Sequence, residues 1–559
     1  MTFDHRKYRP SPTIQRPQRQ WPNRQVEAAP RWCAVDLRDG NQALVKPMTV
    51  EQKTRLFALL VKIGFKEIEV GFPAASQPDF DFVRQLIERN LIPDDVTIQV
   101  LTQARPELIT RTYESLQGAK QAIVHVYNST SRTQREQVFR TDVAGVKTIA
   151  VNGARCVAEH AAQHPETQWT FQYSPESFTG TELEVAAEVV NAVIEVWQPQ
   201  NGQPVIINLP ATVEVSMPNV FADSVEWMLE HMSHREHVTV SLHTHNDRGC
   251  GVAAAELGVL AGADRVEGTL LGNGERTGNM DLVTMAMNLY SQGIDPKLNF
   301  ADMKEITEVV ESVTEIKTHP RHAYAGELVF TAFSGSHQDA IRKCLNNQTH
   351  AVSAEHPWDV AYLPIDPRDL GRRYEEVVRI NSQSGKGGVL HVLEQQFGIT
   401  LPRWLQITFS KIVQTAAEQQ GGEVNAGGIH ALFRQYCMAD NQDMQLQSYD
   451  LANNDDVVKA KFNILVAGQT QQLSGQGKGA VGAIINAIHA YTGVTFSVEH
   501  FDEFSLGNHT EASAMACVRI HAQDQSSDAV ALADDTTRAA LQAVLTATSH
   551  WLKQDKVAA

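Results

Sequence analysis

The sequence predicts an α/β protein: a (β/α)₈ TIM barrel, then a mostly helical linker region, then a C-terminal α+β domain. Between residue 32 and about residue 290, eight short apolar runs alternate with amphipathic stretches in units of about 35 residues. Polar clusters follow these runs, at the strand ends where barrel enzymes place their active sites. A doubly wound open sheet is the alternative, but it rarely contains so many even units.

The expected strands take the apolar runs in order. They are residues 32–37, 67–72, 96–101, 122–127, 169–173, 204–209, 238–243 and 265–271. The first helix is expected over 49–63, because Thr49 followed by Gln52 forms a capping box at its start. The second helix is expected over 79–89, directly after Pro78, since proline is favoured at helix starts.

The chain outside the barrel divides into three segments. Residues 1–30 are rich in Pro, Arg and Gln and predict an irregular N-terminal arm before the barrel at 31–295. Residues 296–428 predict helical linker subdomains. In the segment 429–559, strands are expected at 457–467 and 512–521, and helices at 482–492 and 534–552. The glycines at 475–479 lack the spacing of a P-loop, so we interpret them as a turn that permits close backbone approach.

Composition excludes several classes of protein. The 559 residues are enough for roughly two to four domains of ordinary globular composition. The formal net charge of −17 argues against nucleic acid as a partner, because phosphate binding needs a basic face. No run of about 18 apolar residues could cross a membrane. The six cysteines are scattered, so we expect free thiols and a cytoplasmic location.

Two segments that follow predicted strands carry metal-ligand chemistry. Asp39 follows the first strand, and His243 and His245 lie at the end of the seventh. Residues i and i+2 of a strand point to the same face, so the two imidazoles can share one ion with the carboxylate. The sequence therefore predicts a divalent cation. Imidazoles favour Zn²⁺, whereas a hydrated, oxygen-rich site suits Mg²⁺ or Mn²⁺.

A cation held by three protein ligands keeps open coordination positions. It could chelate both oxygens of a 2-oxo acid and polarise the ketone. The guanidinium of Arg38 could neutralise the charge that develops on oxygen, or it could be only a salt bridge at the barrel mouth. We expect Asn246 and Asp247 to orient the histidines, and Glu275 and Arg276 to form a supporting ion pair.

Several motifs resemble those of one enzyme family. They are residues 37–42, 243–247 and 272–279, and the likeness continues through 335–340, 362–367 and 381–388. They resemble the acyl-CoA-dependent Claisen-condensing synthases, which include 2-isopropylmalate, homocitrate and citramalate synthases. The long form of 2-isopropylmalate synthase is the most similar type, over most of the chain from about residue 30 onward. Asn41 stands where a glutamate is common in the family.

The resemblance implies a set of site residues. The implied metal ligands are Asp39, His243, His245 and Asn279. The implied 2-oxo acid pocket is lined by Arg38, His125, Ser174, Glu176 and Thr212. His337 and Tyr362 would reach the active site of the other subunit of a homodimer. The C-terminal domain would bind leucine, and backbone N–H groups at Gly475, Gly477 and Gly479 could approach that small zwitterion.

The implied activity is that of an acyltransferase. The enolate of acetyl-CoA would attack 3-methyl-2-oxobutanoate, and thioester hydrolysis would release 2-isopropylmalate and CoA, opening leucine biosynthesis under feedback inhibition by leucine. Glu176 and His337 are the two candidates for the enolising base. Mg²⁺ is the favoured metal, Mn²⁺ and Zn²⁺ are alternatives, and K⁺ is a candidate activator.

Three other functions are alternatives. Citramalate or homocitrate synthesis would use the same motifs. A barrel-type metal-dependent hydrolase usually carries its HxH pair on the first strand, whereas here the pair lies on the seventh. A non-catalytic amino-acid sensor would need no intact Arg38–Asp39 pair, so this pair favours an enzyme.

Overall fold

The computed structural model describes residues 4–8, 11, 14–200, 205–372, 386–420, 422–438, 444–454, 457–506 and 513–558. Residues 204, 381–385 and 512, which belong to predicted elements or motifs, lie outside the described residues. The chain forms two compact units. The first is Met1–Val329 with Arg368–Gly371, and the second is Phe330–Pro367 with Arg372–Ala559.

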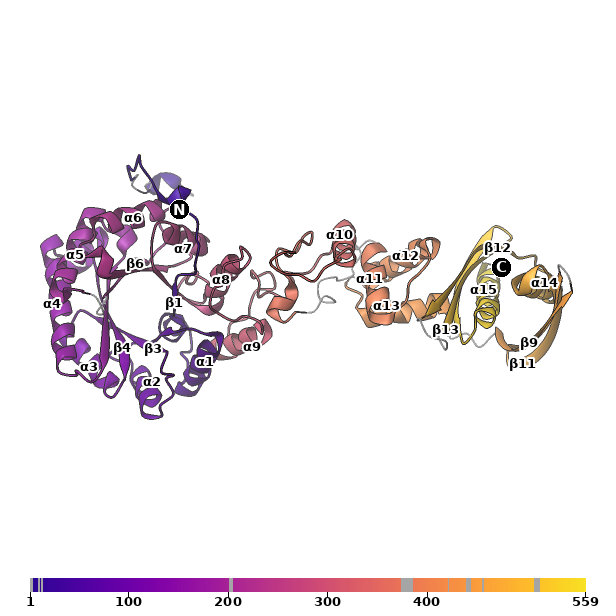
Figure 1. Cartoon of the computed structure of the whole chain (residues 1–559), viewed down its shortest axis with the longest axis horizontal. Coiled ribbons are helices and arrows are strands. Elements are labelled where there is room, and N and C mark those ends of the chain that lie inside the picture. Colours follow the sequence, from indigo (N-terminus) through magenta and orange to yellow (C-terminus); the bar gives the residue numbers. More distant parts are fainter. Residues whose placement is uncertain are drawn as a thin grey trace. The chain divides into compact units, whose positions relative to one another are not determined.

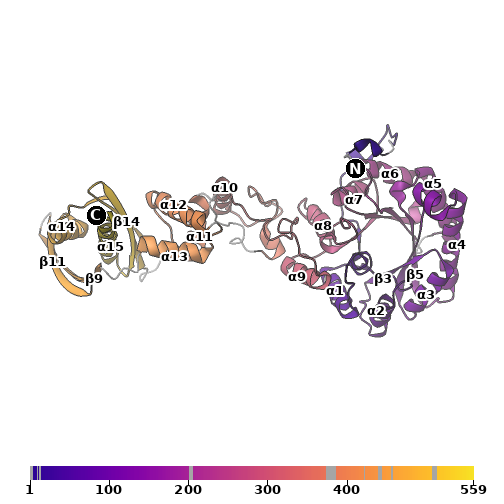
Figure 2. The same ribbon diagram turned by 180° about the vertical axis from the view of Figure 1, so that it is seen from behind.

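Eight parallel strands close into a barrel in sequence order, which confirms the predicted fold (Figure 1). The strands are β1 (Arg31–Ala34), β2 (Glu67–Gly71), β3 (Thr97–Gln103), β4 (Gln121–Ser129), β5 (Gln168–Glu176), β6 (Val205–Ala211), β7 (Val238–Thr244) and β8 (Arg265–Gly268). The helices are α1 (Val50–Ile63), α2 (Gln77–Glu88), α3 (Pro106–Leu116), α4 (Val143–Ala162), α5 (Leu183–Trp197), α6 (Pro218–His231), α7 (Gly251–Leu260), α8 (Leu282–Tyr290) and α9 (Met303–Thr314). Figure 2 shows the helical ring from behind.

Several strand ends differ from the prediction. β1 ends at Ala34 rather than at 37, because the chain turns into a π-helical segment, Asp36–Gly40. β8 ends at Gly268 rather than at 271, because a 3₁₀ turn, Leu270–Gly272, follows it. β5 continues to Glu176, which therefore lies on the strand and not in the loop after it.

Local sequence signals account for the starts of the first two helices. The capping box of α1 is present: the Gln52 amide donates to Thr49 Oγ1 (3.2 Å), and the Thr49 amide donates to Gln52 Oε1 (2.9 Å). α1 ends at Ile63 and is capped by Gly64, whose φ of 116° is open to glycine but strained for other residues. α2 begins at Gln77, two residues earlier than predicted, because Ser76 accepts from the backbone of Asp79 and caps the helix.

The barrel interior contains a buried network of charged and amide side chains. The fully buried guanidinium of Arg265 on β8 donates to the carboxylates of Glu67 (2.6 Å) and Glu267 (2.7 Å). It also donates to Gln99 Oε1 and Ser241 Oγ, both at 2.8 Å. Removing one partner of such a group would leave a buried charge unpaired, which is strongly destabilising. The network therefore ties β2, β3, β7 and β8 to one arrangement.

The described part of the N-terminal arm contains two short 3₁₀ turns, His5–Lys7 and Trp21–Asn23, and packs against the barrel helix α6. Arg16 lies 2.9 Å from Glu226, and Arg19 lies 2.6 Å from Asp223. Both carboxylates are buried beneath the arm.

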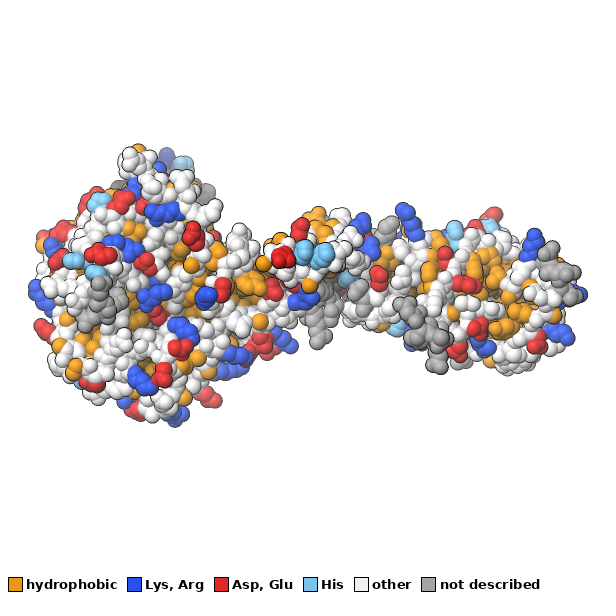
Figure 3. Space-filling model, in the orientation of Figure 1, with side chains coloured by type: hydrophobic (Ala, Val, Ile, Leu, Met, Phe, Trp, Pro, Cys, Tyr) orange, Lys and Arg blue, Asp and Glu red, His pale blue; other side chains and the backbone are white. Residues whose placement is uncertain are grey.

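On the face of the barrel unit shown in Figure 3, acidic and basic side chains are interspersed. No helix in the described part of the chain is long and apolar enough to cross a membrane.

The second unit begins with helices and ends with two small sheets. Its helices are α10 (Gly335–Asn346), α11 (Lys386–Phe397), α12 (Arg403–Gln420) and α13 (Ala426–Phe433). Two antiparallel three-stranded sheets follow, in the orders β11-β10-β9 and β12-β13-β14. One helix follows each sheet in the chain: α14 (Gly479–Thr492) follows the first sheet and α15 (Thr536–Ala558) follows the second. Buried residues of both halves form one hydrophobic core that includes Phe462, Ile484, Val518 and Leu545.

The prediction of one strand and one helix per half was incomplete. β10 (Val457–Val466) and β13 (Ser513–Ala522) match the expected strands. The strands missed are β9 (Met444–Asn454), β11 (Gln469–Gly477), β12 (Ser497–Leu506) and β14 (Gln525–Ala533). β11 shows why: most of its residues are polar and at least partly exposed, and Leu473 is its one buried side chain.

The predicted glycine turn at 475–479 is also corrected. Gly475 and Gly477 lie on β11 beneath α14, and only Gly479 has a left-handed φ, of 75°. A Cβ on Gly475 would approach Ala483 O to 2.1 Å, and one on Gly477 would approach the Gly482 carbonyl carbon to 2.5 Å. These two glycines therefore permit close packing of the helix on the sheet.

Candidate active site

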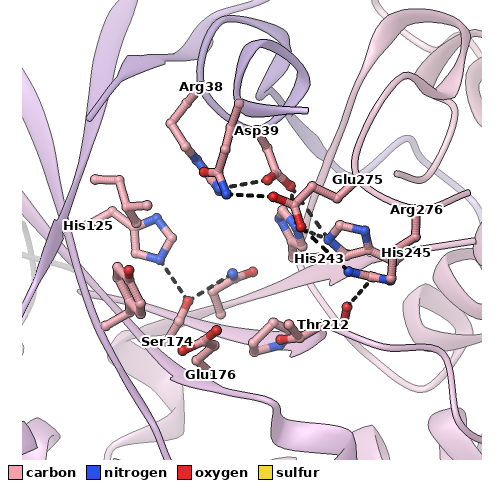
Figure 4. A pocket seen from close by; sticks show the side chains of 15 residues that line it. Arg38, Asp39, His125, Ser174, Glu176, Thr212, His243, His245, Glu275 and Arg276 are labelled. Atoms are coloured by element: carbon pink, nitrogen blue, oxygen red, sulfur yellow. Dashed lines mark hydrogen bonds and ion pairs between the residues drawn. The ribbon is translucent and has the colours of Figure 1, made fainter. Parts of the chain in front are cut away.

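The carboxyl ends of the barrel strands surround a pocket (Figure 4). Its volume is about 670 Å³, including the part that is open to solvent. Its lining includes these predicted site residues: Arg38, Asp39, His125, Ser174, Glu176, Thr212, His243 and His245. Gln42, Tyr127, Asn208, Glu275 and Arg276 also line it. A concave, mostly pre-formed site with converging polar groups is typical of a small-molecule pocket.

The shortened β1 explains how Arg38 and Asp39 both reach this pocket. On a regular strand two consecutive side chains point to opposite faces. Here the amides of Arg38, Asp39 and Gly40 all lie within 3.2 Å of Val35 O, which closes a tight π-type turn. Figure 4 shows both side chains projecting from this turn toward the histidines. Such turns recur at functional sites because they re-aim side chains.

Asp39, His243 and His245 form a compact cluster of metal-ligand atoms. Asp39 Oδ2 lies 3.1 Å from His243 Nε2 and 3.6 Å from His245 Nε2, and the two Nε2 atoms lie 3.3 Å apart. Among the described residues, these three have candidate ligand atoms that all lie within 4.8 Å of one another. Two ring nitrogens and one carboxylate oxygen cannot all pair well with each other, whereas one divalent cation could accept all three lone pairs.

Asn279 adjoins the same cluster. Its Nδ2 lies 2.7 Å from Asp39 Oδ2 and 3.4 Å from His243 Nε2. Its Oδ1 is buried without a hydrogen-bond partner in the described structure. Turning the amide over would present that oxygen to the cluster as a fourth ligand, because amide orientation is assigned from hydrogen bonding. The donor set therefore fits a divalent cation.

Glu267 orients His243 from inside the barrel. Its Oε2 lies 2.9 Å from His243 Nδ1, so Nε2 faces the cluster. Burial opposes the charge on His243, but the bonds to Asp39 and Glu267 outweigh it and raise its pKa to about 9. Burial and the charge on His243 lower the pKa of His245 to about 4. A cation that binds here must displace the proton on His243.

The side chains expected to orient the histidines contact other groups instead. Asn246 Oδ1 accepts from the Gly251 amide (2.9 Å) at the start of α7. Asp247 pairs with Arg276 (2.6 Å), whereas Glu275 and Arg276 approach each other only to 3.9 Å. Asp247 and Arg276 therefore link the loops after β7 and β8.

A hydrogen-bonded chain crosses the pocket floor from Arg38 to Ser174. Glu69 lies 2.5 Å from Arg38 Nε and 2.9 Å from His125 Nδ1. His125 Nε2 lies 2.7 Å from Ser174 Oγ, and this oxygen accepts a hydrogen bond from the Asn208 amide (3.0 Å). Burial opposes the charge on Arg38, but Asp39 and Glu69 raise its pKa, so the guanidinium stays charged. Arg38 is thus a fixed positive charge beside the cluster.

The other predicted residues have distinct surroundings. Glu176 accepts a hydrogen bond from Ser129, and Thr212 Oγ1 accepts from the Ser177 amide (2.9 Å). In the second unit, the rings of His337 and Tyr362 stack with centroids 3.9 Å apart. Tyr362 has a positive φ of 66° and is 59% exposed, an unusual conformation for an aromatic residue.

Asn41 and three other residues have roles that the sequence did not show. Asn41 Oδ1 accepts from the Met48 amide (2.7 Å) and closes the loop after β1. Glu267, Gln99 and Asn208 lie within barrel strands and form its polar interior. A charged or amide side chain inside an apolar run of a predicted barrel strand is the signal that could have identified them.

A closed parallel barrel with an Asp–His–His cluster at its strand ends defines a barrel enzyme with a candidate divalent-metal centre. The HMGL-like family matches residues 29–310. The alpha-isopropylmalate synthase, post-catalytic domain-like family matches 327–394, and the LeuA allosteric (dimerisation) domain matches 423–552.

Relatives that match nearly the whole chain identify the family within this class of barrel enzymes. A 2-isopropylmalate synthase from Alcanivorax borkumensis is 61% identical over 98% of this chain and 97% of its own length. Those from Pseudomonas syringae pv. tomato and Rhodospirillum rubrum are 52% and 50% identical, each over 98% of both chains. The chain belongs to the 2-isopropylmalate synthase family, and its enzyme class is an acyltransferase that converts the acyl group to alkyl on transfer.

Glu267→Gln should weaken metal binding by about 10–100-fold, the usual cost of losing a carboxylate that orients a histidine ligand. Because the proton on His243 must leave, wild-type affinity should rise about tenfold per pH unit below pH 9. Calorimetric titration with Mn²⁺ across this range measures both effects. The exposed Glu236→Gln is the matched control. Unchanged Mn²⁺ affinity in Glu267→Gln would show that Glu267 does not support the ligand.

Proposed function

We propose that the barrel pocket condenses acetyl-CoA with 3-methyl-2-oxobutanoate and then hydrolyses the thioester, giving 2-isopropylmalate and CoA. The observation that carries this proposal is the Asp39–His243–His245 cluster with Arg38 beside it. A cluster with open positions and a fixed guanidinium suits a 2-oxo acid, whose two oxygens can chelate. The family membership of the whole chain supports the choice of substrates.

Asp39, His243, His245 and Asn279 are the proposed metal ligands. A bound divalent ion would supply Lewis-acid polarisation of the ketone, and enzymes of the HMGL-like family depend on such an ion. Mg²⁺ is our favoured ion, with Mn²⁺ or Zn²⁺ as alternatives and K⁺ as an added activator. Arg38 is proposed to stabilise negative charge on the ketone oxygen, since Glu69 and Asp39 hold its guanidinium in place.

The remaining pocket residues are proposed to bind and enolise the substrates. His125, Ser174 and Thr212 would hold the 2-oxo acid by hydrogen bonds, and the chain from Glu69 through His125 fixes the Ser174 hydroxyl. A base must take one methyl proton from the acetyl thioester. The two candidates for that base are Glu176, which lines the pocket, and His337, which lies on α10 of the second unit.

The second unit is proposed to complete and regulate the enzyme. Its LeuA dimerisation domain indicates a homodimer with allosteric regulation. We propose that His337 and Tyr362 act in the partner's active site and that leucine binds to residues 429–559, after the linker at 296–428. Gly475, Gly477 and Gly479 lie where the backbone of β11 meets α14, so their contribution would be to shape that domain. A cytoplasmic location is also proposed, and the six free cysteines support it.

Release of free thiol from acetyl-CoA tests the reaction directly. The protein should release thiol with 3-methyl-2-oxobutanoate, lose that activity after exhaustive chelation, and regain it when Mg²⁺ or Mn²⁺ is added back. Pyruvate and 2-oxoglutarate serve as the parallel substrates for citramalate and homocitrate synthesis. Full activity without metal, or a clear preference for another 2-oxo acid, would contradict the proposal.

Mixing two inactive variants tests the shared active site. His245→Ala lacks a barrel ligand, and His337→Ala lacks the residue supplied by the second unit. Random exchange should restore about a quarter of wild-type activity, because half the dimers are mixed and each has one intact site. A mixture of His245→Ala with Asp39→Ala is the control and should stay inactive. No recovery after verified subunit exchange would mean that each chain completes its own site.

Truncation after residue 428 tests the leucine site. The intact enzyme should be inhibited by leucine, and the shortened enzyme should lose that inhibition along with leucine binding. Coupling between such sites is typically worth about 1–3 kcal/mol, or roughly 5–150-fold in affinity. Calorimetry with leucine on both forms provides a measurement that does not depend on turnover. Equal leucine binding by the shortened chain would place the inhibitor elsewhere.

A further inference from the structure

Lys53 is a fully buried lysine in the first turn of α1, beneath the turn that carries Arg38 and Asp39. Its ammonium donates to Leu37 O at 2.8 Å and lies 3.4 Å from Val70 O. It also lies 2.5 Å from Asp79 Oδ1. A buried ammonium is costly unless its charge is paired and its protons have acceptors, and here all three contacts meet that need.

These contacts fill a gap in the barrel. β1 pairs with β2 only through Cys33 with Glu67 and Ala34 with Ile68, although β2 continues to Gly71. Beyond Ala34 the chain leaves the sheet and forms the π-type turn, so the ladder between the two strands stops. The Lys53 ammonium lies between Leu37 O of the turn and Val70 O of β2, and it connects the two segments where their backbones no longer pair.

Asp79 holds the ammonium from the other side. Its Oδ1 accepts a hydrogen bond from the Lys53 ammonium, and its Oδ2 accepts one from the Phe72 amide at 2.8 Å. A Cβ placed on Gly71 would come within 2.9 Å of the Asp79 carboxylate, so the glycine makes room for this contact. The carboxylate therefore attaches Lys53 to the end of β2 as well as neutralising it.

The contact between Lys53 and the Leu37 carbonyl lies next to Arg38 and Asp39 in the sequence. Leu37 directly precedes Arg38, and its carbonyl belongs to the same turn that aims both side chains. On the other side of this turn, Asp36 Oδ1 accepts from the Leu270 amide (2.9 Å). The turn is thus attached to the β8 loop through Asp36 and to β2 through Lys53.

We propose that Lys53 and Asp79 are positioning residues that set Arg38 and Asp39 against His243 and His245. Neither residue is among those that line the pocket, so their effect is transmitted through the Leu37 carbonyl. The expected effect on turnover rests on the proposed function, whereas the expected effect on metal affinity can be measured without it. If Lys53 and Asp79 had a purely structural role, replacing them would lower the stability of the protein and leave the ligand geometry of the folded protein unchanged.

Three variants of the full chain separate these roles. Lys53→Met removes the ammonium and keeps an unbranched chain of similar length, but leaves the buried Asp79 carboxylate without its cation. Lys53→Met combined with Asp79→Leu removes both charges, which should recover stability relative to the single variant. Leu60→Ala is the matched control, because Leu60 is fully buried in the same helix, two turns away from Lys53.

The measurements are the Mn²⁺ dissociation constant by calorimetry without substrate, kcat and KM for the 2-oxo acid, and the thermal unfolding midpoint. In both Lys53 variants, Mn²⁺ affinity should fall about 10–100-fold and kcat should fall more than KM rises. The double variant should unfold at a higher temperature than the single one and still bind Mn²⁺ weakly. Leu60→Ala should lower the midpoint and keep wild-type Mn²⁺ affinity.

Wild-type Mn²⁺ affinity in the double variant would overturn the proposal and assign the pair to stability alone. The same would follow if Leu60→Ala weakened Mn²⁺ binding as much as Lys53→Met does. Failure of the wild-type protein to release thiol would instead contradict the proposed reaction. The Mn²⁺ titrations would still decide the role of Lys53 in that case.

Discussion

The buried contact between Arg265 and Glu267 joins the barrel core to the candidate metal cluster. One oxygen of the Glu267 carboxylate accepts from Arg265 and Gln172, both at 2.7 Å, and the other faces His243 Nδ1. The orientation of a proposed metal ligand is therefore set by an ion pair in the middle of the sheet. Losing Arg265 would leave the buried Glu267 without its cation, at a cost of about 3–5 kcal/mol, whereas Glu67 would keep its ion pair with Arg31.

A second constraint is that Arg38 and Asp39 are adjacent in sequence and must both face the pocket. A strand cannot do this, so β1 stops early and the chain forms the π-type turn. The turn loses ladder hydrogen bonds, and contacts from Lys53, Asp36 and Glu69 compensate for them. The site thus depends on one local departure from barrel geometry, held by buried polar and charged side chains on three sides.

Much of this architecture follows from the sequence, because its signals are local. The capping box at Thr49 marks α1, and the apolar runs mark the barrel strands. Strand ends and interior pairing depend on contacts between distant segments, so the end of β1 and the link from Glu267 to His243 were not predictable. β11 was missed because its side chains are mostly polar, and Gly477 was taken for a turn residue although it allows α14 to pack closely.

Anomalous diffraction from crystals grown with Mn²⁺ tests most directly whether the Asp39 cluster holds a metal. We expect one strong peak at the barrel mouth, within bonding distance of Asp39 Oδ2 and the Nε2 atoms of His243 and His245. The Asn279 amide should turn its oxygen toward that peak, while Glu267 keeps its contact with His243 Nδ1. A peak elsewhere, with the Asp39 cluster holding only water, would contradict the assignment of this cluster as the metal centre.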